Sequence, residues 1–224
     1  MVMSFGANYD DRFYFGATLG FPFVNYEELS TYAEIDTEDK LPNFNSLTIK
    51  EDLRTYGTGF NMKVGIIFRA TDWLRISGAA HTPSFYSLTD EYSTVMESKL
   101  ESVGNFSEKS PLGKNSYTLM TPGKVLGGIG IVLPKFGIFS FDFERVNYAN
   151  SRLREKDIFS DFEPQNDAIK STYQAANNYR VGLEILASPF SFRGGYAYYG
   201  SPFKSGINDG SESFITGGIG IRDK

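Results

Sequence analysis

The chain has 224 residues, no cysteine, a single histidine, His81, and a formal net charge of −5. These features exclude disulfides, thiolate metal sites and multi-histidine metal centres, and the acidic balance disfavours nucleic acid as a partner. The mean hydropathy is −0.28, and no run of about 18 apolar residues is present, which excludes a helical membrane protein. We expect no cofactor.

Aromatic residues are abundant, with 20 Phe and 14 Tyr making up most of the 16% aromatic content. A membrane β-barrel presents only every second residue of each strand to lipid, so its apolar signal is diluted by lumen residues and polar loops. Aromatic side chains form girdles at both rims of such a barrel. The composition therefore favours a membrane β-barrel.

The chain begins with two alternating segments. Met1–Tyr9 is followed by a break at Asp10-Asp11, and Arg12–Phe23 then places Phe, Ala and Leu at odd positions against Tyr, Gly, Thr and Pro at even positions. This period of two predicts β-strands with one apolar side. We expect the odd positions of Phe13–Phe23 to face outward.

Gly57–Pro83 has the clearest hairpin pattern. Apolar residues alternate on one face from Phe60 to Phe68, Arg69–Asp72 supplies a polar turn, and the alternation resumes at Leu74. Each arm keeps its alternation for about the 9–11 residues that a tilted strand needs to cross a bilayer. The hairpin is therefore long enough to span a membrane.

The later strands are joined by connections that alternate in length. Further alternating segments predict strands within residues 117–133, 139–144, 179–185, 192–198 and 214–222, with short turns at Pro134–Gly137 and Ser188-Pro189. The connections at residues 25–45, 89–115 and 149–172 are long and polar and are predicted as loops. Alternation of short turns with long outside loops is typical of bacterial outer-membrane barrels.

These segments predict an all-β protein, an antiparallel up-and-down transmembrane β-barrel, with residues 1–224 forming one domain. About nine strands are present. Bacterial single-chain barrels have an even number of strands, and no secretory signal is visible, so we expect an incomplete barrel. The expected location is the outer membrane, with outer-membrane lipid as a partner, and the complete protein is expected to be a monomer.

Parity places the charged residues of the strands on the face opposite the phenylalanines. The predicted lumen set comprises Lys63, Arg75, His81, Lys124, Asp142, Glu144, Arg180, Glu184, Arg193 and Arg222. One interpretation is a network of charge pairs that fills the lumen, since unpaired buried charge is costly. The other is that Arg75, Lys124 or Arg180 holds a ligand carboxylate.

Five stretches of the chain are informative together: GANYDDRFYFGATLGFPF, GTGFNMKVGIIFRATDWLRISGAAHTPSFYSLTDEYS, YTLMTPGKVLGGIGIV, FSFDFERVNY and RGGYAYYGSPF. They resemble the outer-membrane FadL/TodX-type transport proteins of Bacteroidetes-like bacteria. The resemblance implies a barrel that moves long-chain fatty acids or other hydrophobic compounds inward, is not an enzyme, and has an N-terminal hatch. The hatch, the signal and the last strands of that family are not found in this sequence.

Two other functions stay open. A barrel hydrolase is suggested by Ser77 and His81, or by Asp142 and Glu144, although Ser77 and His81 are about 13 Å apart along a strand. A soluble β-sheet binding module would leave the phenylalanine-rich faces exposed to water. The glycine clusters at Gly127–Gly130 and Gly217–Gly220 lie inside strands, so a phosphate-binding loop is not indicated.

Prolines interrupt several of the predicted strands. Pro83, Pro122 and Pro202 lie within or at the ends of strands, where each must break the ladder. They are predicted to mark strand ends near the outer rim, or else a side opening toward the membrane, as the resemblance implies.

Overall fold

The computed structural model describes residues 1–38, 40–156 and 161–221. It consists almost entirely of antiparallel β-structure. The strands are β1 (Val2–Tyr9), β2 (Phe13–Gly20), β3 (Phe23–Ile35), β4 (Ser46–Arg69), β5 (Leu74–His81), β6 (Phe85–Leu100), β7 (Gly104–Lys109), β8 (Gly113–Met120), β9 (Lys124–Leu133), β10 (Gly137–Asn147), β11 (Arg152–Glu155), β12 (Ala175–Ala187), β13 (Phe190–Tyr199) and β14 (Glu212–Ile221).

Two helices complete the fold. They are the 3₁₀-helix η1 (Tyr148–Asn150) and the α-helix α1 (Glu163–Thr172). Within the described part of the chain, no helix is both long enough and apolar enough to cross a membrane.

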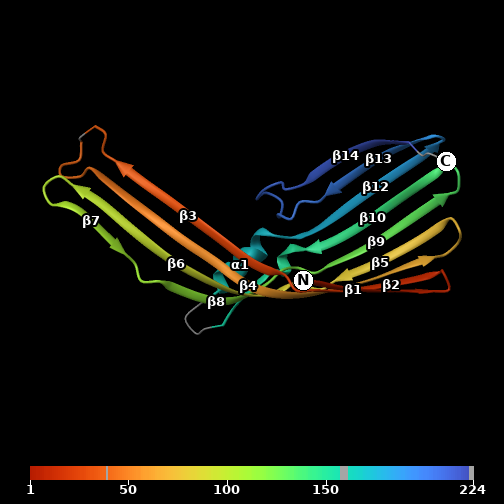
Figure 1. The fold of residues 1–224 in the computed structure, drawn as a ribbon, viewed down its shortest axis with the longest axis horizontal. Helices are drawn as coiled ribbons and strands as arrows, with labels where there is room; N and C mark the ends of the chain where they lie inside the picture. Colours follow the sequence, from red (N-terminus) through yellow and green to blue (C-terminus); the bar gives the residue numbers. More distant parts are fainter. Residues whose placement is uncertain (39, 157–160, 222–224) are drawn as a thin grey trace.

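Nine strands form a curved sheet, here called the wall sheet. Its order is β1, β2, the second half of β4, β5, β9, β10, β12, β13 and β14, and every neighbouring pair is antiparallel. Figure 1 shows these strands side by side in one limb of a V-shaped molecule. This confirms the predicted up-and-down order. The sheet is open among the described residues, with β1 and β14 at its edges, in agreement with the prediction of an incomplete barrel.

The register gives the wall sheet two chemically distinct faces. Phe13 lies opposite Phe68, which lies opposite Ile76, and the row continues with Ile129 on β9 and Phe141 on β10. Aromatic rings stack along this face, as in the Phe13–Phe68 pair at 4.8 Å. The odd positions of Phe13–Phe23 lie on this apolar face, as predicted.

The polar face is the concave one. A Cβ added to Gly128 on this face would lie 2.6 Å from Asp142 Oδ1, and one added to Gly195 would lie 2.7 Å from Thr216 Oγ1. On the apolar face, a Cβ added to Gly194 would meet nothing within 4 Å. Side chains therefore approach one another closely at these points of the polar face, as expected of the inside of a barrel wall.

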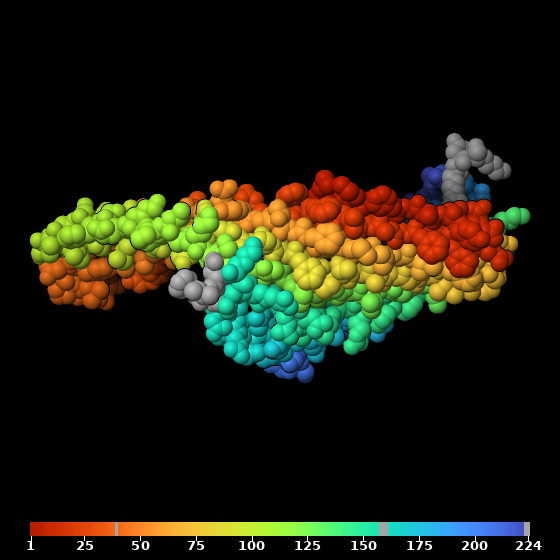
Figure 2. Space-filling view, turned by 90° about the horizontal axis from the view of Figure 1, so that it is seen from below, coloured from red at the N-terminus to blue at the C-terminus, as the bar shows by residue number. Residues whose placement is uncertain are grey.

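A second sheet, here called the arm, extends beyond one end of the wall sheet. It consists of β3, the first half of β4, β6, β7, β8 and β11. Because β4 is 24 residues long, it runs through both sheets. Figure 1 shows the arm as the second limb of the V, and Figure 2 shows it projecting from the wall sheet as a narrow extension.

The arm corrects the prediction of long polar loops. Residues 25–45 contain most of β3, residues 89–115 contain most of β6 and all of β7, and residues 149–172 contain β11 and α1. The polar side chains of these strands are satisfied across the sheet, as in the Lys50–Glu97 pair at 2.9 Å. Polarity on both faces therefore concealed the strands, because one apolar face is the usual strand signal.

Prolines lie where the two sheets meet. His81 pairs with Lys124 in the wall sheet and Phe85 pairs with Met120 in the arm, so Pro83 and Pro122 are opposite each other in the gap between these ladders. The carbonyl of Pro22 accepts a hydrogen bond from the amide of Gly59 at 2.8 Å at the same junction. Proline cannot donate to a ladder, so this row permits the bend. Pro83 and Pro122 lie between strands, which agrees with the prediction of strand ends at these two prolines.

The arm carries its own polar clusters. Glu91 accepts hydrogen bonds from Lys114 and Tyr56, both at 3.0 Å, and these bonds lower the pKa of its carboxyl group. Burial, together with the neighbouring carboxylate of Asp90, raises the pKa of the Tyr117 phenol. Tyr117 also packs on Phe162 at the start of α1, which places the helix near the junction of the two sheets.

Candidate functional site

The nine predicted lumen residues within the described ranges all lie on the concave face of the wall sheet. The register aligns Lys63 with His81 and His81 with Lys124, and it aligns Asp142 with Arg180. Glu184 lies opposite Arg193. The tenth residue, Arg222, falls outside the described residues. Parity alone therefore placed these side chains on the correct face.

Glu144 is the centre of a buried polar network. It is only 6% exposed, and its Oε2 accepts a hydrogen bond from Lys124 Nζ at 2.8 Å, while Arg180 Nη2 lies 3.9 Å away. Its Oε1 accepts a bond from Asn178 Nδ2 at 2.9 Å, and Asn178 Oδ1 in turn accepts the amide of Gly200 at 3.1 Å. The network ties β9, β10, β12 and the end of β13 together.

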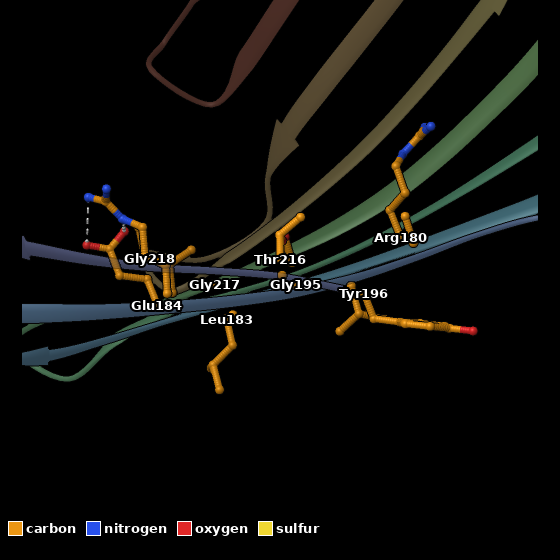
Figure 3. A pocket seen from close by; sticks show the side chains of 15 residues that line it. Arg180, Leu183, Glu184, Gly195, Tyr196, Thr216, Gly217 and Gly218 are labelled. Atoms are coloured by element: carbon orange, nitrogen blue, oxygen red, sulfur yellow. Dashed lines mark hydrogen bonds and ion pairs between the residues drawn. The ribbon is translucent and has the colours of Figure 1, made fainter. Parts of the chain in front are cut away.

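A hollow of about 550 Å³ lies on the concave face over β10, β12, β13 and β14. Ser140, Gly182, Gly195 and Thr216 form its floor, because the register places these small residues in one row. Figure 3 shows Arg180 on one side of this floor and the Glu184–Arg193 pair on the other, while Leu183 points to the opposite face.

A second hollow of about 510 Å³ lies over β2, β4, β5 and β9. Three predicted residues, Lys63, His81 and Asp142, line it beside Gly16, Gly65 and other small side chains. The concave face therefore carries two shallow hollows, and Lys124 and Glu144 lie outside both. Each hollow has a floor of small residues and a few charged groups at its margin.

Arg75 is separate from both hollows and from the Glu144 network. It lies opposite Arg69 and Gly130, and its Nη1 is buried without a hydrogen-bond partner among the described residues. Arg69 is itself paired with Asp72 at 2.7 Å. Arg75 therefore keeps an unsatisfied donor on the concave face.

The predicted set leaves an excess of positive charge on the concave face. Lys63, Arg75, Lys124, Arg180 and Arg193 face the three carboxylates of Asp142, Glu144 and Glu184. The carboxylates of Glu144 and Glu184 are paired, so the predicted pairing of lumen charges is present at these two positions. The remaining cations suit an anionic group that enters the lumen.

The sequence did not identify two residues of this face. Asn178 is 5% exposed and orients Glu144, and Thr216 forms part of the floor of the first hollow. The alternation of charged and apolar residues does not reveal the role of an uncharged side chain. Glu144 can be identified as the partner of Asn178 only from the register of β10 with β12, since helix α1 and β11 separate these strands in the chain.

The concave face continues into the arm. On β4, Gly57, Gly59 and Asn61 precede Lys63 with the same parity, so one face of the arm is an extension of the lumen face. That arm face carries half-exposed apolar side chains at Tyr32, Tyr92, Met96 and Phe106. The same face also carries Glu28, Glu51, Asp90 and Glu108, so its apolar side chains form separate patches among carboxylates.

The hydrolase pairs do not form a reaction centre. Ser77 and His81 are four residues apart on β5, a separation of about 13 Å that prevents a direct hydrogen bond. Both oxygens of Glu144 are occupied by Lys124 and Asn178, so Glu144 is not free to act with Asp142 as an acid–base pair.

Comparison with known proteins gives one structural similarity. No family model matches the sequence, and no curated protein matches it. The crystal structure of the toluene transporter TbuX from Ralstonia pickettii is similar, with 13% identity, a TM-score of 0.45, and alignment over 97% of this chain and 71% of that chain. At that identity and score, the likeness decides neither the family nor the substrate of this chain.

Proposed function

We propose that the chain forms part of the wall of an outer-membrane barrel that transports hydrophobic small molecules, with long-chain fatty acids as substrates. The observation that carries this proposal is the division of nine strands into one apolar convex face and one polar concave face in a single register. A convex apolar face on a water-exposed sheet would be a very large apolar patch, whereas lipid matches it.

The dimensions of the apolar face support a membrane location. On β4 it runs from Phe60 to Phe68, just between the proline junction and the turn at residues 70–73. Nine residues of a tilted strand suit the hydrocarbon core of a bilayer. Beyond Phe60 the same face becomes polar, with Thr58, Tyr56 and Arg54, which is expected above the membrane surface.

The concave face supports the choice of substrate. Its hollows have small, smooth floors that suit an alkyl chain, and its unpaired cations suit a carboxylate. A carboxylate that enters a lumen of low dielectric needs a charged hydrogen-bond partner, whereas a hydrocarbon does not.

Uptake of two ligand classes tests the proposal. In the native gene product, Lys63→Ala and Arg75→Ala, which remove the two predicted lumen cations that have no ion pair among the described residues, are each expected to weaken uptake of a long-chain fatty acid by about tenfold or more, since a hydrogen bond to a charged group contributes roughly 1.5–3 kcal/mol. Uptake of an uncharged hydrocarbon of similar length should change little. Lys99→Ala on the arm is the matched control. Equal loss for both ligands, with lower thermal stability, would leave these residues as scaffolding.

A further inference from the structure

Three basic side chains lie side by side on the concave face, where β5 and β9 reach the junction with the arm. Lys63 on β4 lies opposite His81 on β5, which in turn lies opposite Lys124 on β9. Side chains directly opposite each other in an antiparallel sheet have Cβ atoms about 4.5–5.5 Å apart. His81, the only histidine of the sequence, therefore stands between two cations. Lys63, His81 and Lys124 are here called the basic row.

The charges around the basic row leave a positive excess. The charged groups that act on the His81 imidazole are Lys124, Lys63 and the carboxylate of Glu144. Glu144 lies on β10, diagonally across from Lys124, and it already accepts hydrogen bonds from Lys124 at 2.8 Å and from Asn178 at 2.9 Å. Two cations and one carboxylate give an excess of one positive charge when His81 is neutral, and protonation of His81 adds another.

Asp142 does not cancel this excess. It lines the second hollow together with Lys63 and His81, but it lies in the row of Gly128 and Ser77. Ser77 and His81 are about 13 Å apart along β5, so Asp142 is distant from the basic row. Toward the arm, the next residue of this face on β4 is Asn61, which is uncharged and donates a hydrogen bond to Ser84 at 3.0 Å.

Two members of the basic row face the second hollow. Lys63 is exposed, and the ion pairs of the predicted lumen set within the described parts of the chain do not include it. His81 is half-buried beside it. The hollow has a volume of about 510 Å³, and its floor includes the small residues Gly16 and Gly65. A head group can therefore be held at the basic row while an alkyl chain lies along the floor.

We propose that the basic row binds the anionic head group of an amphiphile, and that protonation of His81 strengthens this binding. A neutral imidazole donates one N–H, whereas the protonated ring donates two and carries a positive charge. Hydrogen bonds between ionised groups are about twice as strong as those between neutral groups. The inference rests on the proposed function, in which an anionic hydrophobic molecule enters the lumen, and it adds where the head group binds and how pH controls the affinity.

The experiment measures binding of hexadecanesulfonate to the native gene product in neutral detergent, at about pH 5.5 and at about pH 8. A sulfonate stays ionised over this range, so a change in affinity arises in the protein. Hexadecanol is the uncharged probe of the same chain length. We expect the wild type to bind the sulfonate about fivefold to tenfold more tightly at the lower pH, and to bind the alcohol equally at both.

Three variants and a control assign this pH dependence. His81→Gln should reduce the difference between the two pH values to less than about twofold, and His81→Arg, whose charge does not titrate, should bind tightly at both. Lys63→Gln should weaken sulfonate binding about tenfold at each pH and keep the difference between them. Lys99→Gln on the arm removes the same charge far from the basic row and should stay within about twofold of the wild type.

The proposal is overturned if the wild type binds the sulfonate equally at both pH values, or if His81→Gln keeps the pH dependence. Heat modifiability checks that each variant is folded, and the wild type and His81→Arg decide the question if His81→Gln does not fold. A wild type that binds neither probe would contradict the proposed transport function. Sulfonate binding without pH dependence would contradict only the role of His81, so the two proposals fail separately.

Discussion

At the scale of single residues, Glu144 is the side chain whose loss should affect the wall sheet most. Glu144→Ala removes the acceptor of both Lys124 and Asn178 and leaves two donors in a largely buried site. An unsatisfied buried donor costs about 1–3 kcal/mol, and we discount the larger penalty of a fully buried ion pair because Lys124 and Arg180 are partly exposed. We expect a loss of about 1–3 kcal/mol, measured as lower resistance to heat unfolding in detergent.

Glu97→Ala is the control for this prediction. Glu97 pairs with Lys50 on the exposed arm, and such surface pairs contribute about 0–1 kcal/mol. A loss from Glu144→Ala no larger than that from Glu97→Ala would show that the network around Glu144 does not hold the strands together. Glu144→Gln should retain the bond with Asn178 and fall between the two.

Residue positions were predictable where a charge alternates with apolar side chains. Lys63 and Arg180 were placed on the concave face because neighbours of opposite parity are apolar. The pairing of Lys124 with Glu144 was not predictable residue by residue, because the register between β9 and β10 depends on the geometry of their turn at residues 134–136. The partnership of Glu144 with Asn178 lies across a still longer connection.

At the scale of elements, the close approach of β4 to β6 beside the bend depends on glycine. A Cβ on Gly57 would lie 2.0 Å from the carbonyl oxygen of Ser87, which is backbone and cannot move alone. Gly57→Ala should therefore force the strands apart and cost about 1–3 kcal/mol, as other overpacked sites do. Faster hydrogen exchange of β6 amides near Ser87, with little change in the wall sheet, is the expected measurement.

Gly16→Ala is the matched control on β2. A Cβ at Gly16 would meet nothing within 4 Å, so alanine fits there, and it should stabilise the strand by up to about 0.5–1 kcal/mol by lowering backbone entropy in the unfolded chain. Unchanged exchange of the β6 amides in Gly57→Ala would mean that the two strands can separate without cost. In that case glycine at this position would not be needed for the bend.

The elements of the wall sheet were predictable and those of the arm were not. β2 and β5 have one apolar and one polar face, and alternation reveals such strands. β3 carries glutamates on both faces, with Glu27 and Glu28 adjacent, so its sequence resembles a polar loop. Its strand conformation comes from pairing with β4 along its whole length, which is a tertiary effect that a local pattern does not contain.

At the scale of the whole molecule, the proposed orientation puts the wall sheet in the membrane and the arm outside it. The wall sheet presents apolar side chains on its convex face, whereas the arm presents ion pairs such as Arg54–Glu27 on the continuation of that face. β4 passes through both sheets without a break, so the height of the bend is fixed relative to the wall. The row of prolines marks the boundary between lipid and water in the proposed orientation.

The 224-residue chain expressed alone is expected not to make a working pore. β1 and β14 each pair on one side only, so the amide and carbonyl groups along their outer edges have no partners in the described sheet. Each unsatisfied group in hydrocarbon costs several kcal/mol, which is why membrane-spanning sheets close into barrels. The isolated chain should aggregate or associate through these edges in detergent, as measured by light scattering and by single-channel conductance.

The second part of this test compares the isolated chain with the native gene product. If the native gene product supplies strands that pair with β1 and β14, it should be monodisperse and heat-modifiable where the isolated chain is not. The apolar convex face is common to both samples, so a difference between them isolates the edges as the cause. A monodisperse, heat-modifiable monomer from the isolated chain would show instead that its nine strands close by themselves, with β1 paired to β14.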